Sequence, residues 1–228
     1  MMTKKQNKKD EGMNSEDFRD FFIENYAPEY VNIPAFLVEA DKEHTRRLPP
    51  DTDKNQSWRS VLGRGLEKVL EHILARQLES LGLELIPIKE AIELVEIDFG
   101  QYGTHLPDVD LLVYQPSRDR ILAILSIKNS LRERATQTAY WRLKLRAQSN
   151  TKNIKVFLLT PNSDGDLRSD RPPKKNRAVL ETDTDAIYVV NKPEFSLADY
   201  LYPGVESRIR MIDELADDLA ELANRKYL

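Results

Sequence analysis

The chain has 228 residues, of which 40% are hydrophobic and 32% are charged, and it contains no cysteine. This length and apolar content suffice for one sizeable core, which favours a globular domain over a disordered or fibrous chain. Without cysteine, disulfides and thiolate ligands are excluded, so a metal would bind oxygen or one of the three histidines. No apolar run is long enough for a membrane span and no secretory signal is recognisable, so a cytoplasmic location is expected.

The distribution of charge is more informative than its sum. The formal net charge is −4, which does not by itself indicate a nucleic-acid partner, because binding a polyanion requires a cationic surface. Acidic residues crowd 213–218, whereas 132–146 carries five positive side chains and only one acid. This asymmetry leaves room for a basic face.

The first third of the chain predicts a tail followed by helices. Residues 1–14 are expected to be disordered, and 15–228 to form a single domain that begins with a helical segment and ends with a helix. Asn14 can cap a first helix whose aromatic residues recur at helical spacing. Residues 39–56 are polar and contain prolines, which indicates a loop. Ser57 then opens a long helix with a broad apolar stripe that ends at Gly82.

The remaining elements alternate between apolar β-rich runs and amphipathic helices. The expected strands are 90–99, for which a helix is the alternative, and 109–114, 120–128, 154–160 and 186–190. The expected helices are 130–146 and 205–223, and 115–119 and 161–177 are expected to be a hairpin connection and a loop. The middle of the chain thus reads helix, three strands, helix, strand. This order predicts an α/β fold with a mixed sheet flanked by helices.

Two aspartates stand at the start of the second expected strand, in the sequence Pro107-Asp108-Val109-Asp110. Asp108 and Asp110 lie two residues apart, on the same face of an extended chain, and supply the hard anionic oxygen that suits magnesium. A turn that caps the strand is the simpler interpretation of this tetrapeptide taken alone.

Lys128 ends the next strand, in which almost every preceding side chain is apolar. An amine at this position would lie beside the sheet interior and near the hairpin partner, where it needs a carboxylate or phosphate neighbour. The alternative is a lysine whose amine extends to solvent from the strand end.

The Pro107-Asp108 step, the hairpin and the Ser126-Ile127-Lys128 strand end together resemble the PD-(D/E)xK nuclease superfamily over roughly residues 57–160. The resemblance implies a restriction-endonuclease-like three-layer sandwich with a mixed central sheet and an αβββαβ core. It implies that Asp108 and a second acid hold Mg²⁺, and that Lys128 orients and polarises the attacking water. Ser126 departs from the pattern, because this catalytic position usually carries Asp or Glu.

The sequence after Lys128 narrows the resemblance. Arg132-Glu133-Arg134 is similar to the Arg-(Asp/Glu)-Arg element of restriction endonucleases that read CCGG sites, several of which carry Ser-x-Lys, and the chain resembles the BsaWI-like group. Arginine can bond O6 and N7 of guanine, and glutamate can accept from N4 of cytosine. Alone, the three residues would be read as the solvated first turn of a helix.

The second acid has to come from elsewhere in the chain. Some of these enzymes supply it about four turns after the lysine, but this sequence has Tyr140-Trp141-Arg142 there, and both aromatic residues are expected to pack in the core. Superfamily members often present a glutamate from the first core helix, after a glycine. Glu67, which follows Gly65, is therefore the candidate metal ligand, and Glu71 one turn later is the alternate. Either could be an ordinary surface acid.

The resulting hypothesis is a type II restriction endonuclease, a homodimer that makes Mg²⁺-dependent double-strand cuts in DNA at a short palindrome containing CCGG. One alternative is a repair or structure-specific nuclease of the same fold. The other is a DNA-binding protein without catalytic activity. A basic cluster at 174–177, with Arg168 and Arg171, is a candidate phosphate contact or a solvated loop.

Overall fold

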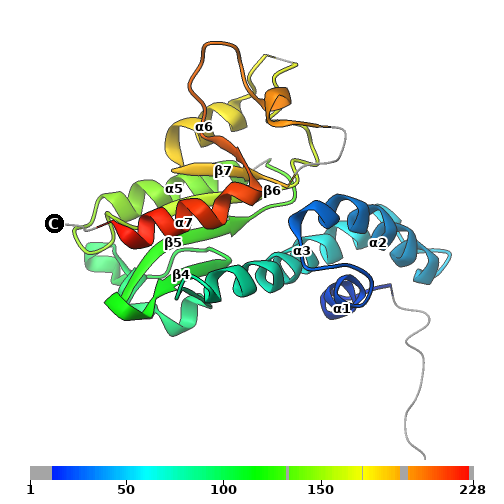
Figure 1. Cartoon of the computed structure of the whole chain (residues 1–228), viewed down its shortest axis with the longest axis horizontal. Coiled ribbons are helices and arrows are strands. Elements are labelled where there is room, and N and C mark those ends of the chain that lie inside the picture. Colours follow the sequence, from blue (N-terminus) through cyan, green and yellow to red (C-terminus); the bar gives the residue numbers. More distant parts are fainter. Residues whose placement is uncertain (1–11, 132–133, 171, 191–194, 226–228) are drawn as a thin grey trace, which may run out of the picture. The chain divides into compact units, whose positions relative to one another are not determined.

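A computed structural model describes residues 12–131, 134–170, 172–190 and 195–225 (Figure 1). The chain divides into two compact units, Met1–Leu70 and Glu71–Leu228. The long helix α3 (Lys54–Glu79) contributes residues to both units. No helix within the described ranges is both long and apolar enough to cross a bilayer.

The first unit packs three helices around an aromatic cluster. Helices α1 (Ser15–Asn25) and α2 (Ile33–Arg47) precede α3, and the expected cap is confirmed, because the Asn14 side chain accepts hydrogen bonds from the first turn of α1. The Phe36 ring stands edge-on to Phe18 and Phe22, with centroids 4.7 and 5.0 Å apart. A Cβ added at Gly65 would lie 2.4 Å from the Phe18 ring, so this glycine allows close packing of the helices.

Helix α2 corrects the expected loop at 39–56. Only residues 48–53 connect α2 to α3, and α3 begins at Lys54 rather than Ser57. Ala40 and His44 are buried at helical spacing, and Glu43 pairs with Arg46 and Arg47 on the outer side. The polar composition therefore reflects one solvated face of an amphipathic helix, and not a loop. Of the expected tail, residues 1–11 lie outside the described ranges, while Met13 is buried.

The second unit is built on a six-stranded mixed sheet in the order β1-β4-β5-β6-β7-β8. The strands are β1 (Glu84–Ile86), β4 (Leu111–Gln115), β5 (Arg120–Ile127), β6 (Lys155–Thr160), β7 (Ala186–Val189) and β8 (Ile209–Met211). The first two neighbouring pairs are antiparallel, and the pairs from β5 to β8 are parallel. A separate two-stranded hairpin joins β2 (Ile97–Asp98) and β3 (Thr104–His105).

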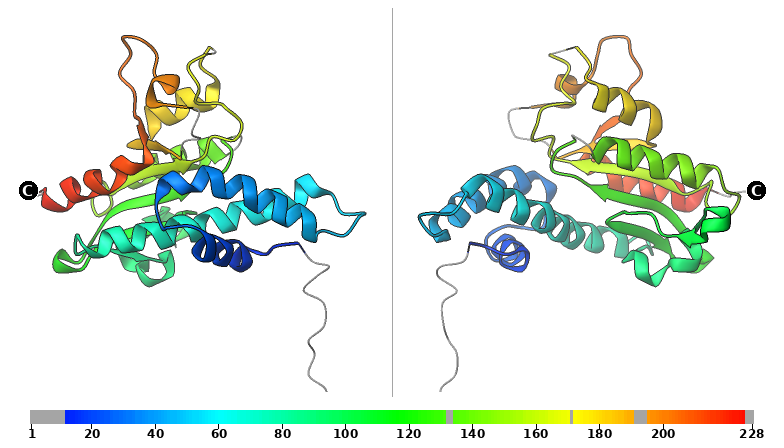
Figure 2. Two further views of the ribbon diagram at one scale, coloured as in Figure 1. Left: turned by 45° about the vertical axis from the view of Figure 1, so that its right-hand side comes forward. Right: turned by 180° about the vertical axis from the view of Figure 1, so that it is seen from behind.

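Helices cover both faces of this sheet, which gives three layers. Helix α7 (Leu215–Asn224) crosses one face in Figure 1, and α5 (Arg134–Arg146) crosses the other in the rear view of Figure 2. Helix α6 (Lys175–Asp183) lies beside α5, and α4 (Ile92–Val95) packs against β5. The 3-10 turns are Tyr30–Asn32, Ile88–Glu90, Gly100–Tyr102, Pro116–Arg118, Leu197–Tyr200 and Ile212–Glu214. The sequence α3, β1, β4, β5, α5, β6 is the expected αβββαβ core, so the fold class is confirmed.

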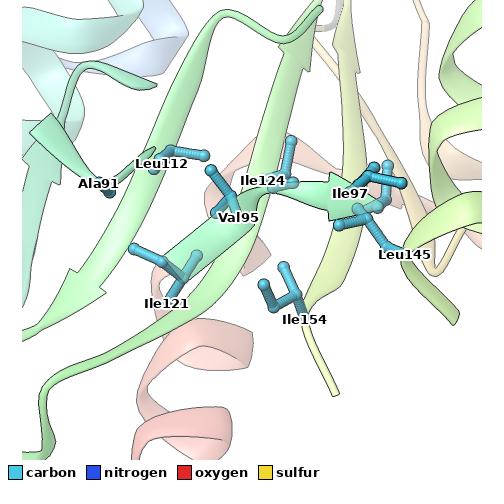
Figure 3. Packing of buried hydrophobic residues seen from close by; sticks show 9 residues of the cluster. Ala91, Val95, Ile97, Leu112, Ile121, Ile124, Leu145 and Ile154 are labelled. Carbon is cyan, nitrogen blue, oxygen red and sulfur yellow. The ribbon is translucent and has the colours of Figure 1, made fainter. Parts of the chain in front are cut away.

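The core on the α5 face is made of aliphatic side chains from five separate segments. Figure 3 shows Leu112 of β4 and Ile121 and Ile124 of β5 around Val95, and Leu145 of α5 beside Ile97. The same buried set includes Ala91, Ile154 and Val156. Partly buried residues of the 106–109 connection pack on the same cluster. The packing fixes the path of the chain just before β4, where the two aspartates lie.

The first strand of the core is not the one expected. Residues 90–99 form α4 and the short β2, because Ala91 and Val95 are buried one helical turn apart. The strand that pairs with β4 is β1, in which Leu85 aligns with Val113. Three half-exposed residues are too short a run to show a period of two.

Two further elements near the C-terminus differ from expectation. The predicted loop 161–177 extends too far, because α6 begins at Lys175. The buried positions of α6 are Arg177 and Leu180, so an arginine stands where an apolar residue would signal a helix. The predicted helix 205–223 is divided, because Ile209 pairs with Ile187 as the edge strand β8 and α7 begins only at Leu215. The spacing of Ile209 and Ile212 favours a helix, and the three residues of β8 are too few to show the alternation of a strand.

A buried carboxylate ties α5 to the parallel strands. Asp185 accepts hydrogen bonds from Arg142 Nε (2.9 Å), the Val156 amide (3.1 Å) and Lys155 Nζ (3.3 Å). The Arg142 and Asp185 side chains are only 3% and 10% exposed. Burial alone would raise the pKa of Asp185, but the bonds from Arg142 and Val156 and the nearby positive charges hold this pKa below its ordinary value of 3.8.

We expect Asp185→Asn to lower the free energy of unfolding at pH 7 by about 3 kcal/mol, because the Arg142 charge stays buried without its partner. A carboxyl whose pKa is lowered in the folded state stabilises the fold above its unfolded pKa, and this contribution disappears as the pH falls through the folded pKa. As the pH falls below 3.8, the free energy of unfolding of the variant should therefore decrease less than that of the wild type. Urea unfolding at pH 7 and at pH 2–4, with exposed Asp213→Asn as control, measures both effects. Equal acid sensitivity of Asp185→Asn and the wild type would contradict this role.

Candidate active site

The β4–β5 hairpin brings the two sequence motifs together. The connection ends at Asp119, whose φ of 45° turns the chain back into β5. Leu111 pairs with Leu125, so one further step along this register sets Asp110 opposite Ser126 and diagonal to Lys128. The aspartates at the start of β4 and the lysine after β5 therefore share one edge of the sheet.

Asp110 is the carboxylate partner of Lys128. Its Oδ2 atom accepts a hydrogen bond from Lys128 Nζ and another from the Ile127 amide, each at 2.6 Å. The side chains of Lys128 and Asp110 are 10% and 19% exposed. The Lys128 amide in turn donates to the Leu159 carbonyl of β6 at 2.9 Å. The expectation that this lysine needs a carboxylate or phosphate neighbour is confirmed, and the neighbour is the carboxylate of Asp110.

Asp108 lies two residues earlier and engages a different element. It is exposed, between buried Pro107 and half-buried Val109. Its Oδ2 atom accepts a hydrogen bond from the Gln137 side-chain amide on α5. Asp108 thus presents a carboxylate to solvent beside the Asp110–Lys128 pair, with its chain held by packing on both sides.

Ser126 is not exposed to solvent beside Asp108 and Lys128. Its side chain is buried, and its hydroxyl lies 3.2 Å from the Thr138 hydroxyl of α5. Thr138 donates to the Arg134 carbonyl at 3.1 Å, so the Ser126 hydroxyl is the donor to Thr138. The residue at the usual acid position therefore joins β5 to α5.

The segment after Lys128 is fastened to the loop after β6. Ser163 donates to Asn129 through both its hydroxyl (2.7 Å) and its amide (3.2 Å). The amide of buried Leu131 donates to Asp164 Oδ2 at 2.7 Å. Of the expected base-reading residues, Arg132 and Glu133 lie outside the described residues, and exposed Arg134 begins α5.

The two candidate second acids lie one turn apart on α3. Glu67 is half-buried and belongs to the unit Met1–Leu70, whereas exposed Glu71 begins the unit that contains Asp108, Asp110 and Lys128. Gly65, which pointed to Glu67 in the sequence, is required by the Phe18 ring. A metal-binding role for Glu67 remains a prediction.

Two other expectations change. Arg177 is buried and donates to the carbonyls of Leu167 (2.5 Å) and Tyr200 (2.6 Å), so it supports the fold and is neither a phosphate contact nor a solvated residue. Lys174 pairs with Asp166, and Arg171 lies outside the described residues. Tyr140, expected in the core, is 41% exposed, whereas Trp141 is half-buried.

The acidic side chains at the sheet edge fit a hydrated Mg²⁺ ion. Asp108 and Asp110 are hard oxygen donors, and Mg²⁺ normally uses one or two carboxylates, with water and substrate phosphate in its other positions. In the part of the chain that the structure describes, no three or more histidine or acidic side chains gather into a metal site. A metal enclosed by protein ligands alone is thus not supported by these residues.

Gln137 and Asp164 were missed from the sequence because their partners are distant along the chain. Asp108 and Gln137 are 29 residues apart, and Leu131 and Asp164 are 33 apart. The available signal was a polar inner face on α5, where Thr138 and Arg142 are buried among apolar residues. Buried polar side chains require specific partners, which marks this face as more than a packing surface.

The chain is similar to several known restriction endonucleases. The family model of BsaWI restriction endonuclease type 2 matches residues 84–212. A Methanocaldococcus jannaschii protein assigned as the type II restriction enzyme MjaVIP is 32% identical over 75% of this chain and 79% of its own length. A Helicobacter pylori protein assigned as the type II restriction enzyme HpyAORF263P is 32% identical over 70% of this chain and 94% of its own length. The restriction endonuclease PspGI, solved with substrate DNA, shares the fold, with a TM-score of 0.52 and 15% sequence identity. The similarity covers 92% of this chain and 87% of the PspGI chain.

We expect Asp110 and Lys128 to be energetically coupled. A double-mutant cycle of Asp110→Asn and Lys128→Met should give a coupling of about 1–3 kcal/mol in the free energy of unfolding, because each single variant leaves a largely buried group without its partner. The exposed pair Arg225–Glu221 is the control and should show no resolvable coupling. Additive effects at Asp110 and Lys128 would contradict the geometry.

Proposed function

Because the chain belongs to the BsaWI type 2 restriction endonuclease family, we propose that it is a Mg²⁺-dependent deoxyribonuclease that cuts both strands of a short palindrome containing CCGG. The observation that carries the proposal is the Asp110–Lys128 pair beside Asp108 at one edge of the sheet. Two acids just before one strand and a lysine just after its neighbour are the groups needed to hold a hard cation and orient a water molecule.

Each of these groups has a distinct proposed role. Asp108 supplies carboxylate oxygen for Mg²⁺, and Glu67 is the proposed second acid, with Glu71 and Asp110 as alternates. A bound Mg²⁺ would stabilise charge at the scissile phosphate and lower the pKa of the attacking water. Lys128 has three donors, of which one contacts Asp110 at 2.6 Å, so the others can orient water or a phosphate oxygen.

Asp110 and Ser126 would act through their neighbours. Asp110 directs the Lys128 ammonium along the sheet edge and offsets the cost of partly burying this cation. Ser126 bonds Thr138 and so helps to set α5 against β5. The acid function that the motif usually places at position 126 would thus pass to another part of the chain.

The proposed reading of bases follows from the chemistry of Arg132, Glu133 and Arg134. Guanine O6 and N7 suit bidentate arginine, and cytosine N4 suits a glutamate acceptor. The bonds that Asn129 and Leu131 make to the loop after β6 support this proposal, since they anchor the chain directly before the triad. A palindromic site implies two-fold symmetry, so we propose a homodimer on double-stranded DNA.

The first test of this function is cleavage of a plasmid that contains CCGG, incubated with Mg²⁺, Ca²⁺ or EDTA. We expect discrete fragments with Mg²⁺ and none with EDTA. Lys128→Ala and Asp108→Ala should lower the cleavage rate by at least ~100-fold while duplex binding persists, because these side chains act on water and metal rather than on bases.

Lys152→Ala, a change at an exposed lysine of the same unit, is the matched control and should cleave normally. Near-normal cleavage by a folded Lys128→Ala variant would remove the active-site assignment. Degradation without discrete fragments would favour a repair or structure-specific nuclease. Binding without cleavage would favour a non-catalytic DNA-binding protein.

The second test concerns sequence discrimination. Arg132→Ala and Arg134→Ala should lose roughly 1–3 kcal/mol each in affinity for a CCGG duplex and much less for a scrambled duplex at the same salt concentration. Glu133→Gln should also lose discrimination, because a neutral amide donates as well as accepts. Arg146→Ala removes an exposed charge from the other end of α5 and serves as control, with equal effects on both duplexes. If the three triad variants behave like this control, the triad binds phosphates instead of bases.

A further inference from the structure

Helix α5 contacts both motif strands through two consecutive residues. Gln137 donates its side-chain amide to Asp108, before β4, and Thr138 accepts from Ser126 of β5. The two side chains point to different strands and leave the helix from its first two turns. One helix thus touches the candidate metal ligand and the position where the motif usually has an acid.

The position of α5 is fixed independently of these two contacts. Near its other end, Arg142 is 3% exposed and bonds Asp185 twice, through Nε at 2.9 Å and Nη2 at 3.2 Å. Asp185 also accepts from the Val156 amide at the start of β6. Because a buried charged pair resists displacement, the helix presents Gln137 from a rigid support.

Asp108 depends on Gln137 for its orientation. Its side chain is exposed and lies outside the β4 ladder, which begins at Leu111. Among the described residues, Gln137 is the one hydrogen-bond donor to this carboxylate. Without that bond the exposed side chain would sample several rotamers, and ordering it would oppose cation binding.

The chemistry of the donor also matters. The Gln137 amide is neutral and occupies one carboxylate oxygen, which leaves the full negative charge of Asp108 and its other oxygen for a cation. A lysine or arginine at this place would neutralise the acid, as Lys128 does for Asp110. The two neighbouring aspartates therefore differ, because one is held by a cation and the other by an amide.

We propose that Gln137 is a positioning residue for divalent-cation binding, which fixes the Asp108 carboxylate so that its second oxygen faces the ion. The inference rests on the proposed function only in taking Asp108 as a metal ligand. Outer partners that orient a metal-binding side chain typically contribute 10–100-fold to metal affinity. Loss of the amide should thus weaken cation binding without removing the ligand itself.

The test uses Mn²⁺ as the probe and the full chain without DNA. Free Mn²⁺, followed by electron paramagnetic resonance during a titration, gives the dissociation constant. Gln137→Met keeps the length of the side chain and removes the donor, and we expect about 10-fold weaker Mn²⁺ binding. Gln148→Met is the matched control, because Gln148 makes two hydrogen bonds to the Asp98 backbone and contacts neither aspartate of the site. It should bind Mn²⁺ as the wild type does.

A double variant separates positioning from general loss of stability. In the Asp108→Asn background, Gln137→Met should cause no further loss of Mn²⁺ affinity, because the carboxylate that it orients is gone. In DNA cleavage, Gln137→Met should raise the Mn²⁺ concentration for half-maximal rate by about 10-fold and keep the rate at saturation within a few-fold of wild type.

The possible results distinguish this inference from the proposed function. A wild-type chain that neither binds Mn²⁺ nor cleaves DNA would overturn both. If the wild type binds and cleaves, Mn²⁺ affinity of Gln137→Met equal to or tighter than wild type overturns the positioning role alone. An equal loss in Gln148→Met, or a further loss in the Asp108→Asn background, would also overturn it.

Discussion

One carboxylate oxygen of Asp110 holds the candidate site together. It accepts from the Ile127 amide, where β5 leaves its antiparallel ladder, and from the Lys128 ammonium, each at 2.6 Å. The first bond satisfies a strand-end donor, and the second balances a cation that is only 10% exposed. The carboxylate that completes the strand thus also sets the direction of the lysine, so the same contact serves the hairpin and the candidate site.

Helix α5 adds the second constraint, and it does so with polar groups that lie among its buried apolar residues. Arg142 joins it to Asp185 at the parallel side of the sheet, while Gln137 and Thr138 reach the antiparallel side. Such bonds are directional, so they fix the rotation and height of the helix more narrowly than aliphatic packing does. Of the proposed base-reading residues, Arg132 and Glu133 come directly before this helix in the sequence and Arg134 begins it, which would couple recognition to the position of Asp108.

The sequence was sufficient for those parts of the fold and site that have local signals. The long apolar runs of β5 and β6 could be identified in this way, and with them the αβββαβ order. The motif also indicated Asp108 and Lys128, whose catalytic roles remain predictions. Short or polar elements could not be identified from the sequence. The three residues of β1 are too few to show an alternating pattern, and α6 buries an arginine in place of an apolar residue. The partner of Lys128 and the role of Gln137 depend on the hairpin register and on helix placement, which exist only in the folded chain.

The central claim is that Asp108 binds the divalent cation while Asp110 holds Lys128 beside it. The most direct measurement is a crystal structure of the chain on a CCGG duplex with Mn²⁺, in which anomalous scattering locates the metal. We predict a peak at roughly 2–2.5 Å from an Asp108 oxygen, with Lys128 still bonded to Asp110 and facing the scissile phosphate. A metal bound away from Asp108, or a Lys128 ammonium directed away from the DNA backbone, would contradict the account.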